Sequence, residues 1–455
     1  MLSKQQLSIV VFTTISGLTT SYLLGLPLIL GFTIGFLSLL IFSNSRGTDR
    51  RTLINAIKDG ASRTQEVIWI LFMVGLIIPT WTLSGTIPYL IGQGIQWIHP
   101  AYMTTLTFWF AALFSMMLGT STGTLSAVGI PMMGVASLTG VPLPIMAGAL
   151  VSGAFVGDRT SPFSSAHRLV ADSTGTTVRA QYRFLMPTTG LALGSATVFF
   201  FIIDYIGNWQ VPHSALQLDI YREHFVFSPW LVMPAVVLIT AILFRLKTRH
   251  AFMLSIAVAI LVGSLLQDVS PFTWLHSMLH GYTNTELPAL HTKGLLNMVD
   301  LVLLIALAGS FNGILEHTRS LEPYMSALIG HNSSMAQATA RIGLFGLGLG
   351  AVSCTQTLPI MMSGRNVLPI WSQRFQREHL SRIISDTALV FAAMIPWNML
   401  AVLCATIVNV PVHQYIPYAI FLWSLPLWTF IVSLTIGSRI DSVAVVDAHP
   451  KSDAS

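Results

Sequence analysis

The sequence predicts an all-α, polytopic membrane protein with about 10–12 transmembrane helices, because a span needs roughly 20 apolar residues. Of its 455 residues, 53% are hydrophobic and only 9% are charged, whereas a soluble domain has about a quarter of its residues charged. Glycine, proline and hydroxyl-bearing residues interrupt several apolar runs. Interrupted backbone within a bilayer must face protein or a water-filled cavity. We therefore expect broken helices and re-entrant hairpins.

The basic residues and the cysteines argue against several other classes of protein. The formal net charge of +5 comes from basic residues in short loops, where they orient spans and do not bind nucleic acid. Cys354 and Cys404 lie in apolar surroundings and give neither a disulfide framework nor metal-ligand spacing. There is no metal-ligand cluster such as H-E-x-x-H, and no nucleophile elbow is expected. The sequence therefore predicts no enzyme.

Residues 1–63 are predicted to form a pair of spans and a basic cytoplasmic loop. Apolar runs at 7–24 and 26–42 precede a segment with five basic residues, which are Arg46, Arg50, Arg51, Lys58 and Arg63. Positive charge in short loops marks the cytoplasmic side, so the N-terminus is expected inside as well. No small-residue cleavage site follows the first run, which predicts a retained span. Residues 52–63 are expected to form an amphipathic surface helix.

Residues 64–206 are expected to form a first transport repeat, in which a polar stretch follows two apolar segments, 66–84 and 103–118. This stretch reads GTSTGTLSAVGIPMMG over residues 119–134, and its first six residues are all Gly, Ser or Thr. Such residues are poor helix formers, since Ser and Thr compete for backbone hydrogen bonds. The composition favours an unwound stretch or a hairpin tip that lines a cavity. The alternative is a small-residue seam between packed helices.

An apolar run then breaks at Gly157-Asp158-Arg159, and Ser161-Pro162 follows at once. A carboxylate and a broken backbone are both costly in hydrocarbon unless they face protein or water. Asp158 is therefore a candidate ion or proton site. Proline frees a carbonyl one turn earlier, and carbonyls, hydroxyls and one carboxylate suit a hard cation such as sodium. The alternative is a span that simply ends in a polar cytoplasmic loop.

The remainder of the chain is divided into linker spans, a second repeat and a tail. Residues 207–294 contain apolar runs at about 229–245 and 251–267. The second transport repeat is expected over 295–437, with hydroxyls and an amide at Ser353 to Thr357. It also holds Asp386 at the start of an apolar run that Pro396-Trp397-Asn398 interrupts. The polar tail, 438–455, is expected to be disordered.

The two repeats have similar patterns. SCTQTLPIMM at 353–362 is similar to TSTGTLSAVGIPMM at 120–133, and a span broken by Asp and Pro follows each. Duplication with paired broken helices is typical of secondary transporters, whose binding sites lie between the repeats. In inverted repeats the loops 163–183 and 365–382 should face opposite sides, yet both are basic and are therefore expected inside. The sequence leaves that topology open.

These motifs resemble the NhaC-type sodium/proton antiporter family of the ion-transporter superfamily, over roughly residues 60–430. The resemblance rests on segments that occur in the family's order: LSGTIPYLI, GTSTGTLSAVGIPMMG, GAFVGDRTSPFSSAHRLVADSTGT, FNGILE, SCTQTLPIMMSGR and SRIISDTALVFAAMIPWN. It implies a polytopic inner-membrane carrier with two inverted repeats that couples sodium to protons. Some relatives also exchange organic acids, such as malate for lactate.

Carried over by residue, the family's GD-K-x-SP pattern falls on Gly157, Asp158, Arg159, Ser161 and Pro162. Its later acid falls on Asp386 and its P-W-N on Pro396, Trp397 and Asn398. Directly after the Ser-Pro pair, family members read Leu-Ser-Asp-Thr-Thr-Asn. At these positions this chain has Ser165 in place of the carboxylate and a basic pair at His167 and Arg168. This departure fits an anionic or zwitterionic substrate, and it fits equally a positive cytoplasmic loop.

The sequence thus predicts sodium/proton antiport by alternating access. The expected ion- and substrate-binding residues are Asp158, Ser161, Thr120, Ser121, Thr122, Thr124, Ser353, Thr355, Gln356, Thr357, Asp386 and Asn398, with sodium held by Asp158 and Asp386. Open alternatives are an ion pair of Asp386 with Arg382 one turn earlier and a helix-to-helix hydrogen bond from Asn398. Glu316 is either a third acid in the pathway or an interfacial anchor, and His167 is either a pH sensor or a solvated loop residue.

No cofactor is expected, only transported sodium and protons. The expected partners are membrane lipid and a small cation, with no nucleic acid, and a homodimer stays open. The alternative function is a sodium- or proton-coupled carrier or exchanger of a small organic acid or amino acid, which would add an organic substrate. The expected location is the bacterial inner membrane, crossed several times.

Overall fold

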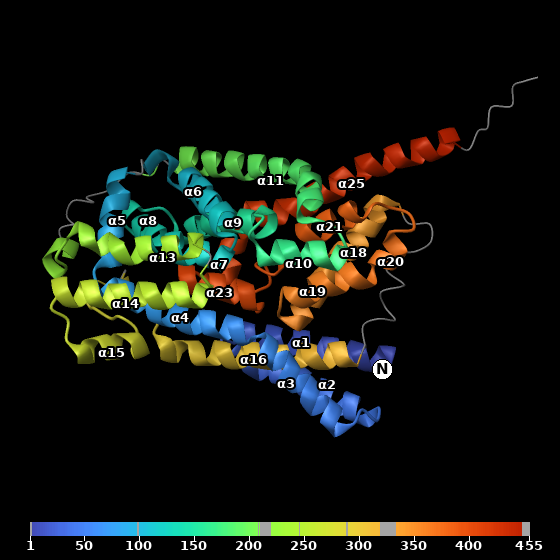
Figure 1. The fold of residues 1–455 in the computed structure, drawn as a ribbon, viewed down its shortest axis with the longest axis horizontal. Coiled ribbons are helices and arrows are strands. Elements are labelled where there is room, and N and C mark those ends of the chain that lie inside the picture. The colour runs from blue at the N-terminus through green and yellow to red at the C-terminus, as the bar shows by residue number, and fades with distance from the viewer. Residues whose placement is uncertain are drawn as a thin grey trace, which may run out of the picture.

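The computed structural model describes residues 2–97, 100–207, 209, 220–244, 246–287, 290–318 and 334–447, and every regular element in these ranges is a helix (Figure 1). The N-terminal segment forms α1 (Lys4–Leu23), α2 (Leu28–Ser45) and α3 (Arg50–Arg63). The next helices are α4 (Gln65–Leu83), α5 (Thr86–Trp97), α6 (Met103–Leu118), α7 (Ser121–Thr124), α8 (Ile130–Thr139), α9 (Leu143–Thr160), α10 (Ser165–Thr174) and α11 (Val178–Gly207). The prediction of an all-α fold is confirmed.

A middle group and a second half complete the molecule. The middle group is α13 (Met233–Leu243), α14 (Thr248–Leu266) and α15 (Pro271–His280). The second half consists of α16 (Val299–His317), α18 (Met335–Ser353), α19 (Thr357–Met361), α20 (Leu368–Trp371), α21 (Arg377–Asp386), α22 (Ala388–Phe391), α23 (Met399–Val408), α24 (Val412–Tyr415) and α25 (Ile420–Asp447). Because α25 continues to Asp447, the expected disordered tail from 438 is wrong over 438–447, and 448–455 lie outside the described residues.

Several helices are long and apolar enough to cross a membrane. Within the described ranges there are six of them, namely Leu28–Ser45, Gln65–Leu83, Val178–Gly207, Thr248–Leu266, Leu295–His317 and Met335–Ser353. A further pair, Met399–Val408 and Val412–Tyr418, is bent by 82° at a short break. Shorter apolar helices, such as Met103–Leu118, complete the apolar body. These helices fit the predicted polytopic fold with broken spans.

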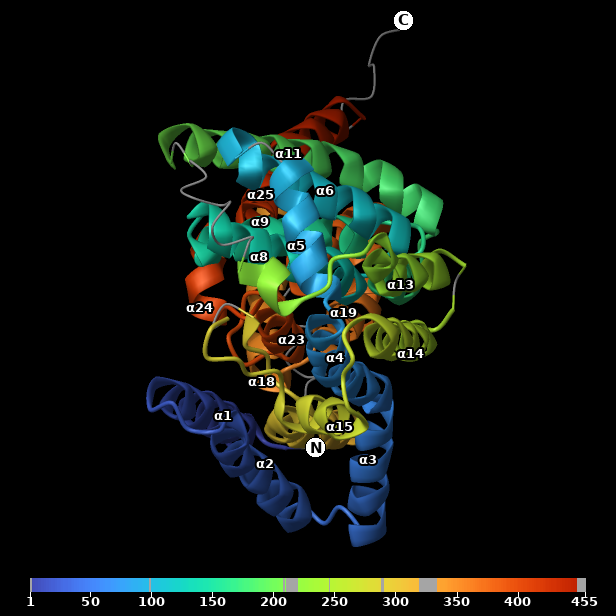
Figure 2. The same cartoon turned by 90° about the vertical axis from the view of Figure 1, so that its left-hand side faces the viewer.

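The N-terminal helices pack on the rest of the chain through small residues. Figure 2 shows α1, α2 and α3 grouped on one side of the body. A Cβ atom on Gly60 of α3 would collide with the carbonyl oxygen of Gly309 in α16, so the two backbones touch, as small residues allow between membrane helices. Residues 52–63 are therefore helical as expected, but one face of α3 is docked on α16 and buried at Leu53, Ala56 and Gly60.

The two halves repeat the same sequence of elements. Helix α6 ends at Gly119 (φ +70°), and its counterpart α18 ends at Cys354 (φ +55°), both in the left-handed region. After each, a short helix is followed by a π-helical segment, Leu125–Gly129 or Met362–Asn366. Left-handed backbone is unusual for residues other than glycine, so the shared conformation at Gly119 and Cys354 marks equivalent positions.

The broken spans that follow also match. Ser164 caps α10 and Asn398 caps α23, each through its side chain, and each cap stands two residues after a proline. Both capped helices are 10 residues long and end at a left-handed residue, Gly175 (φ +62°) or Asn409 (φ +53°). The chain is therefore internally duplicated beyond the motifs that the sequence revealed.

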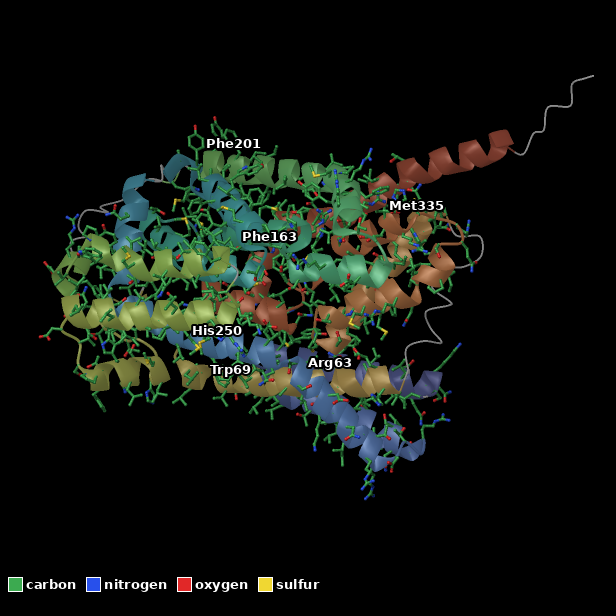
Figure 3. The ribbon with its side chains drawn as sticks, in the orientation of Figure 1. Arg63, Trp69, Phe163, Phe201, His250 and Met335 are labelled. Atoms are coloured by element: carbon green, nitrogen blue, oxygen red, sulfur yellow. The ribbon has the colours of Figure 1, made fainter. Side chains whose placement is uncertain are left out.

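The hairpins of the two repeats lie toward opposite ends of the long axis of the molecule. Figure 1 places α6 and α8 toward the left of the long axis and α18 and α20 toward the right, and Figure 3 shows Met335, the first residue of α18, on the right. Because α10 corresponds to α23, the basic loops 163–183 and 365–382 are not counterparts. They are neighbours: a Cβ atom on Gly175 would lie 3.5 Å from Nη1 of Arg377. Both loops can therefore be basic and face the same side.

Candidate functional site

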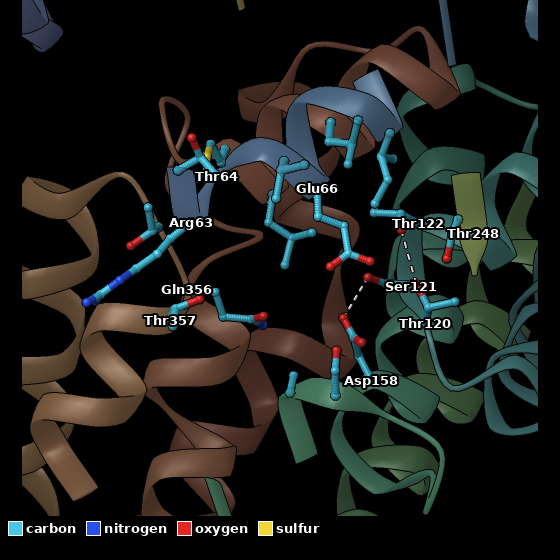
Figure 4. Close-up of a pocket in the computed structure, with 18 of the residues that line it drawn as sticks. Arg63, Thr64, Glu66, Thr120, Ser121, Thr122, Asp158, Thr248, Gln356 and Thr357 are labelled. Atoms are coloured by element: carbon cyan, nitrogen blue, oxygen red, sulfur yellow. Dashed lines mark hydrogen bonds between the residues drawn. The ribbon is translucent and has the colours of Figure 1, made fainter. Parts of the chain in front are cut away.

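The first hairpin consists of α6 and the helical segments after Gly119, and the second consists of α18 and the helical segments after Cys354. Their tips, which are the polar stretches directly after Gly119 and Cys354, meet at one cavity of about 900 Å³. Its lining includes three residues of the first tip and three of the second, which are Thr120, Ser121, Thr122, Thr355, Gln356 and Thr357. Figure 4 shows the first group, together with Gln356 and Thr357 of the second, around the same space as Asp158. These two triplets occupy equivalent positions, since they follow Gly119 and Cys354 respectively. The cavity therefore lies where the pseudo-symmetric halves of the chain come together.

Gly119 allows the first tip to turn back toward the broken span. Its φ of +70° is the left-handed conformation that glycine adopts without strain. A Cβ atom at this position would also lie 2.7 Å from the backbone carbonyl carbon of Phe163, which is labelled near the middle of the molecule in Figure 3. The Thr120 hydroxyl then caps α7 by accepting a hydrogen bond from the Gly123 amide (3.4 Å). For residues 119–134, these features favour the predicted hairpin tip over the alternative of a small-residue seam between packed helices.

Asp158 lies in the last turn of α9 and lines the cavity with only 7% of its surface exposed. The Ser121 hydroxyl donates a hydrogen bond to its Oδ2 (2.6 Å), which Figure 4 marks with a dashed line. The Ser164 hydroxyl donates to the Asp158 backbone carbonyl (2.6 Å). The carboxylate is thus held at the break of α9, against the first hairpin tip.

The second tip is held by amides from neighbouring helices. Asn312 of α16 donates from Nδ2 to the Ser353 carbonyl and to the Thr355 hydroxyl, both at 3.2 Å. Gln356 donates from Nε2 to the Leu389 carbonyl (2.9 Å), which belongs to the second break. The tip therefore presents hydroxyl and amide oxygens beside Asp158, and the cavity has one buried carboxylate among neutral oxygens.

Four other predicted site residues lie outside the cavity lining and support the tips. The Thr124 hydroxyl donates to the Thr120 carbonyl (2.8 Å), and the Ser161 hydroxyl donates to the Met116 carbonyl (2.8 Å). Ser353 is fully buried beneath the second tip. Asn398 donates from Nδ2 to the Gly350 carbonyl (3.3 Å) and caps α23 with Oδ1. Asn398 thus makes the helix-to-helix contact that the sequence left open.

Asp386 does not share the cavity with Asp158. Both partners of a fully buried ion pair, Asp386 and Arg159, have side chains with 0% exposure, and Asp386 is not among the cavity-lining residues of the described chain. The sequence predicts that two carboxylates surround one sodium ion, but of these two only Asp158 lines the cavity. The direct partner of Asp386 is Arg159, which lies 227 positions away along the chain, and not Arg382.

The segment after the break is a helix and not a loop. His167 belongs to α10, which covers Ser165–Thr174, and it has 0% exposure, so the alternative of a solvated loop histidine is wrong. Its ring faces the interior because the Ser164 cap starts the helix there and accepts from the His167 amide (3.1 Å). Ser165 and Arg168 line the cavity instead.

Charged residues surround the cavity beyond the tips. Glu316 forms an ion pair with Arg63 of α3, which agrees with an anchoring role, although both residues also line the cavity together with Glu66, Arg168 and Lys247. Sequence reasoning missed Glu66, which stands at the start of the apolar helix α4. The only feature of the sequence that pointed to Glu66 was its position as an acidic residue just after a basic segment.

The site does not offer a transition-metal centre. Among the described residues no group of three or more His, Cys, Asp and Glu side chains could hold a metal ion. One buried carboxylate with hydroxyl and amide oxygens is instead a donor set for a hard cation. Residues 119–123 do read G-x-S-x-G, but no strand precedes them and the Ser121 hydroxyl bonds to a carboxylate, so the nucleophile elbow of hydrolases is not formed.

Inverted repeats with broken helices whose tips line a shared cavity define a secondary active transporter, and the protein is a multi-pass membrane protein. The sequence profile of the Na+/H+ antiporter family matches residues 169–437. The chain belongs to that family, and the resemblance stated from its motifs is confirmed.

Curated relatives cover most of the chain. The Na+/H+ antiporter NhaC of Bacillus subtilis is 26% identical over 88% of this chain and 91% of its own length. The malate-2H+/Na+-lactate antiporter of the same species is 24% identical over 89% and 88%. The arginine/ornithine antiporter ArcD of Halobacterium salinarum is 25% identical over 80% and 78%. All three are antiporters, and they differ in what their names say they exchange.

Proposed function

We propose that the protein exchanges sodium for protons at the central cavity, and that Asp158 is the group that binds either ion. The observation that carries this proposal is the contact of Asp158 with Ser121 in a cavity shared by both hairpin tips. A carboxylate binds a proton or a sodium ion but not both at once. Competition for one carboxylate therefore couples the two fluxes in opposite directions.

The sodium ion is coordinated by oxygens of interrupted helices in place of its water. Thr120, Ser121 and Thr122 approach from one side and Thr355 to Thr357 from the other, and hydroxyl, amide and carboxylate oxygens are the ligands that hard cations prefer. The repeats, 64–206 and 295–437, move relative to each other around this site, with 207–294 as linker spans. The location is the bacterial inner membrane, with the basic loops in the cytoplasm.

A second candidate is the exchange of a small organic acid or amino acid coupled to sodium or protons. The cavity volume of about 900 Å³ lies in the range of pockets for small molecules, about 300–1,000 Å³, and exceeds what one ion needs. Arg168 and Lys247 also line it and would attract a carboxylate. Two of the relatives are named for organic substrates.

Transport in proteoliposomes with an imposed pH gradient tests both candidates. Sodium antiport predicts that added sodium collapses the gradient without any organic solute, and that Asp158→Asn abolishes the response. Asp172→Asn is the matched control, because Asp172 is an exposed carboxylate on α10. No response to sodium or lithium, together with uptake of a labelled carboxylate or amino acid, would reject sodium/proton exchange in favour of the second candidate.

A further inference from the structure

Each repeat has a buried carboxylate near the end of the helix that precedes its break, but the two are not at equivalent positions, since Asp158 stands six residues before its cap Ser164 and Asp386 twelve residues before its cap Asn398. Asp158 lies in the last turn of α9, and Asp386 is the final residue of α21. Each helix precedes the break of its repeat, which ends at the cap Ser164 or Asn398. Each half of the chain therefore has one buried carboxylate that could attract a cation.

The surroundings of the two carboxylates differ. Asp158 faces the cavity and a serine hydroxyl. Asp386 instead accepts a hydrogen bond from Nε of Arg159 (2.7 Å) and forms an ion pair with the Nη2 atom of the same guanidinium. Arg159 comes from the first repeat, directly after Asp158 in the chain, so the second carboxylate is neutralised by a residue of the opposite repeat.

All three nitrogen atoms of the Arg159 guanidinium donate hydrogen bonds. Its Nη1 donates to the Thr189 hydroxyl (2.5 Å) and its Nη2 to the Thr188 hydroxyl (2.8 Å), both on α11. Arg159 has 0% exposure. A planar group with three anchored nitrogens has little freedom to leave, and removing either partner of a buried pair leaves an uncompensated charge.

A second buried arginine adds to the positive charge around Asp386. Arg382, one turn earlier on α21, is 1% exposed and donates from Nη2 to the Ser433 hydroxyl of α25 (2.9 Å). The groups that face Asp386 are therefore Arg159 from α9, Arg382 from its own helix and the Thr188 hydroxyl of α11. Two cations against one carboxylate leave no electrostatic attraction for a sodium ion there.

We propose that Arg159 is a built-in cation that takes the place of a transported ion at Asp386, the second buried carboxylate. This inference rests on the proposed function of Asp158. It has two consequences: one sodium ion binds per chain, and Asp386 holds α21 against α9 without taking part in ion exchange. Arg159 and Asp386 are positioning residues, because they act on the transported ion only through the arrangement of the helices.

Equilibrium binding of radioactive sodium to the purified wild-type protein gives the first test. The inference predicts one sodium ion per chain, and none in Asp158→Asn. Two ions per chain, one of them lost in Asp386→Asn, would overturn the inference while leaving the proposed function in place. No bound sodium in the wild type would overturn the proposed function and this inference with it.

Paired neutral variants give the second test. Asp386→Asn alone leaves Arg159 buried without its partner and should lower the ratio of folded to unfolded protein by at least about a hundredfold. The double variant Arg159→Gln with Asp386→Asn removes both charges and should keep sodium-driven proton flux, with a half-saturating sodium concentration within about threefold of the wild type. A double variant that is folded and monodisperse but shows no sodium-dependent flux would overturn the inference, because Asp386 would then be an ion ligand.

Discussion

Ser121 donates a hydrogen bond to Asp158 across the first hairpin, with 2.6 Å between Oγ and Oδ2. The serine belongs to the tip after α6 and the aspartate to the broken end of α9, 37 residues later. A hydroxyl has one hydrogen to donate and lone pairs that can face a cation. Ser121 can therefore hold the empty carboxylate in place and also offer its oxygen to a bound sodium ion.

Ser121→Ala should weaken sodium binding without unfolding the protein. A hydrogen bond to a charged group contributes about 1.5–3 kcal/mol, so the sodium concentration for half-maximal antiport should rise by at least about tenfold. The measurement is sodium-driven proton flux in proteoliposomes that contain a pH-sensitive dye. Ser126→Ala is the control, since Ser126 is buried next to the tip and its hydroxyl has no partner among the described residues. Equal half-saturation values in both variants would remove Ser121 from the site.

Cys354 should tolerate glycine far better than Cys404 does. Both thiols are fully buried, but Cys354 has a φ of +55°, where a side chain costs about 1–3 kcal/mol, while Cys404 lies inside α23. Glycine relieves strain at 354 and lowers helix propensity by about 1 kcal/mol at 404. The thermal unfolding midpoint, followed by tryptophan fluorescence, should therefore fall less in Cys354→Gly than in Cys404→Gly. The reverse order would show that Cys354 is not strained.

The polar tips and Asp158 could be predicted from sequence because their signals are local. Six consecutive Gly, Ser and Thr residues, or a carboxylate next to a glycine break, are visible without a fold. The partner of Asp386 could not be predicted, because Arg159 reaches it only after α9 and α21 pack together. The one-turn spacing favoured Arg382 instead. The burial of His167 could not be predicted either, because its helix starts at a serine cap within a stretch that resembles a polar loop.

The contact between His224, in the described segment 220–228 before α13, and Glu286 should contribute stability that depends on pH. The hydrogen bond from Nδ1 of His224 to the Ile220 carbonyl (2.9 Å) and the contact of Nε2 with Glu286 (2.7 Å) raise the pKa of His224 above its ordinary value. The folded state thus binds the proton more tightly than the unfolded chain. The contribution is present below the unfolded pKa, about 6.5, and is lost as the pH rises through the higher folded pKa.

His224→Gln should remove this pH dependence. Between pH about 6 and about 8, the unfolding midpoint of the wild type should fall by a small amount more than that of the variant, since exposed ion pairs contribute little. His250→Gln, an exposed histidine on α14, is the control and should behave as the wild type. An identical pH response in the wild type and His224→Gln would show that the contact with Glu286 does not stabilise the fold.

Asp204 should matter for stability and not for transport, although a buried acid in a membrane helix is by default a functional candidate. Its carboxylate, 1% exposed on α11, accepts hydrogen bonds from the amides and hydroxyls of Thr104 and Thr105 at 2.8–3.0 Å and from Nε1 of Trp209 (3.2 Å). It thereby caps the start of α6, whose far end carries the first tip. With both oxygens engaged, no ligand position is left for an ion.

Asp204→Ala should therefore lower the free energy of unfolding by at least about 2 kcal/mol, because several buried donors lose their acceptor. Sodium-driven flux per folded molecule should stay within about twofold of the wild type, since that loss acts on the fold and not on the bound ion. Asp158→Asn should show the opposite pattern, with flux lost and the unfolding midpoint kept. The two variants together separate the acid that caps a helix from the acid that binds the ion. Loss of flux in folded Asp204→Ala would place Asp204 in the transport pathway.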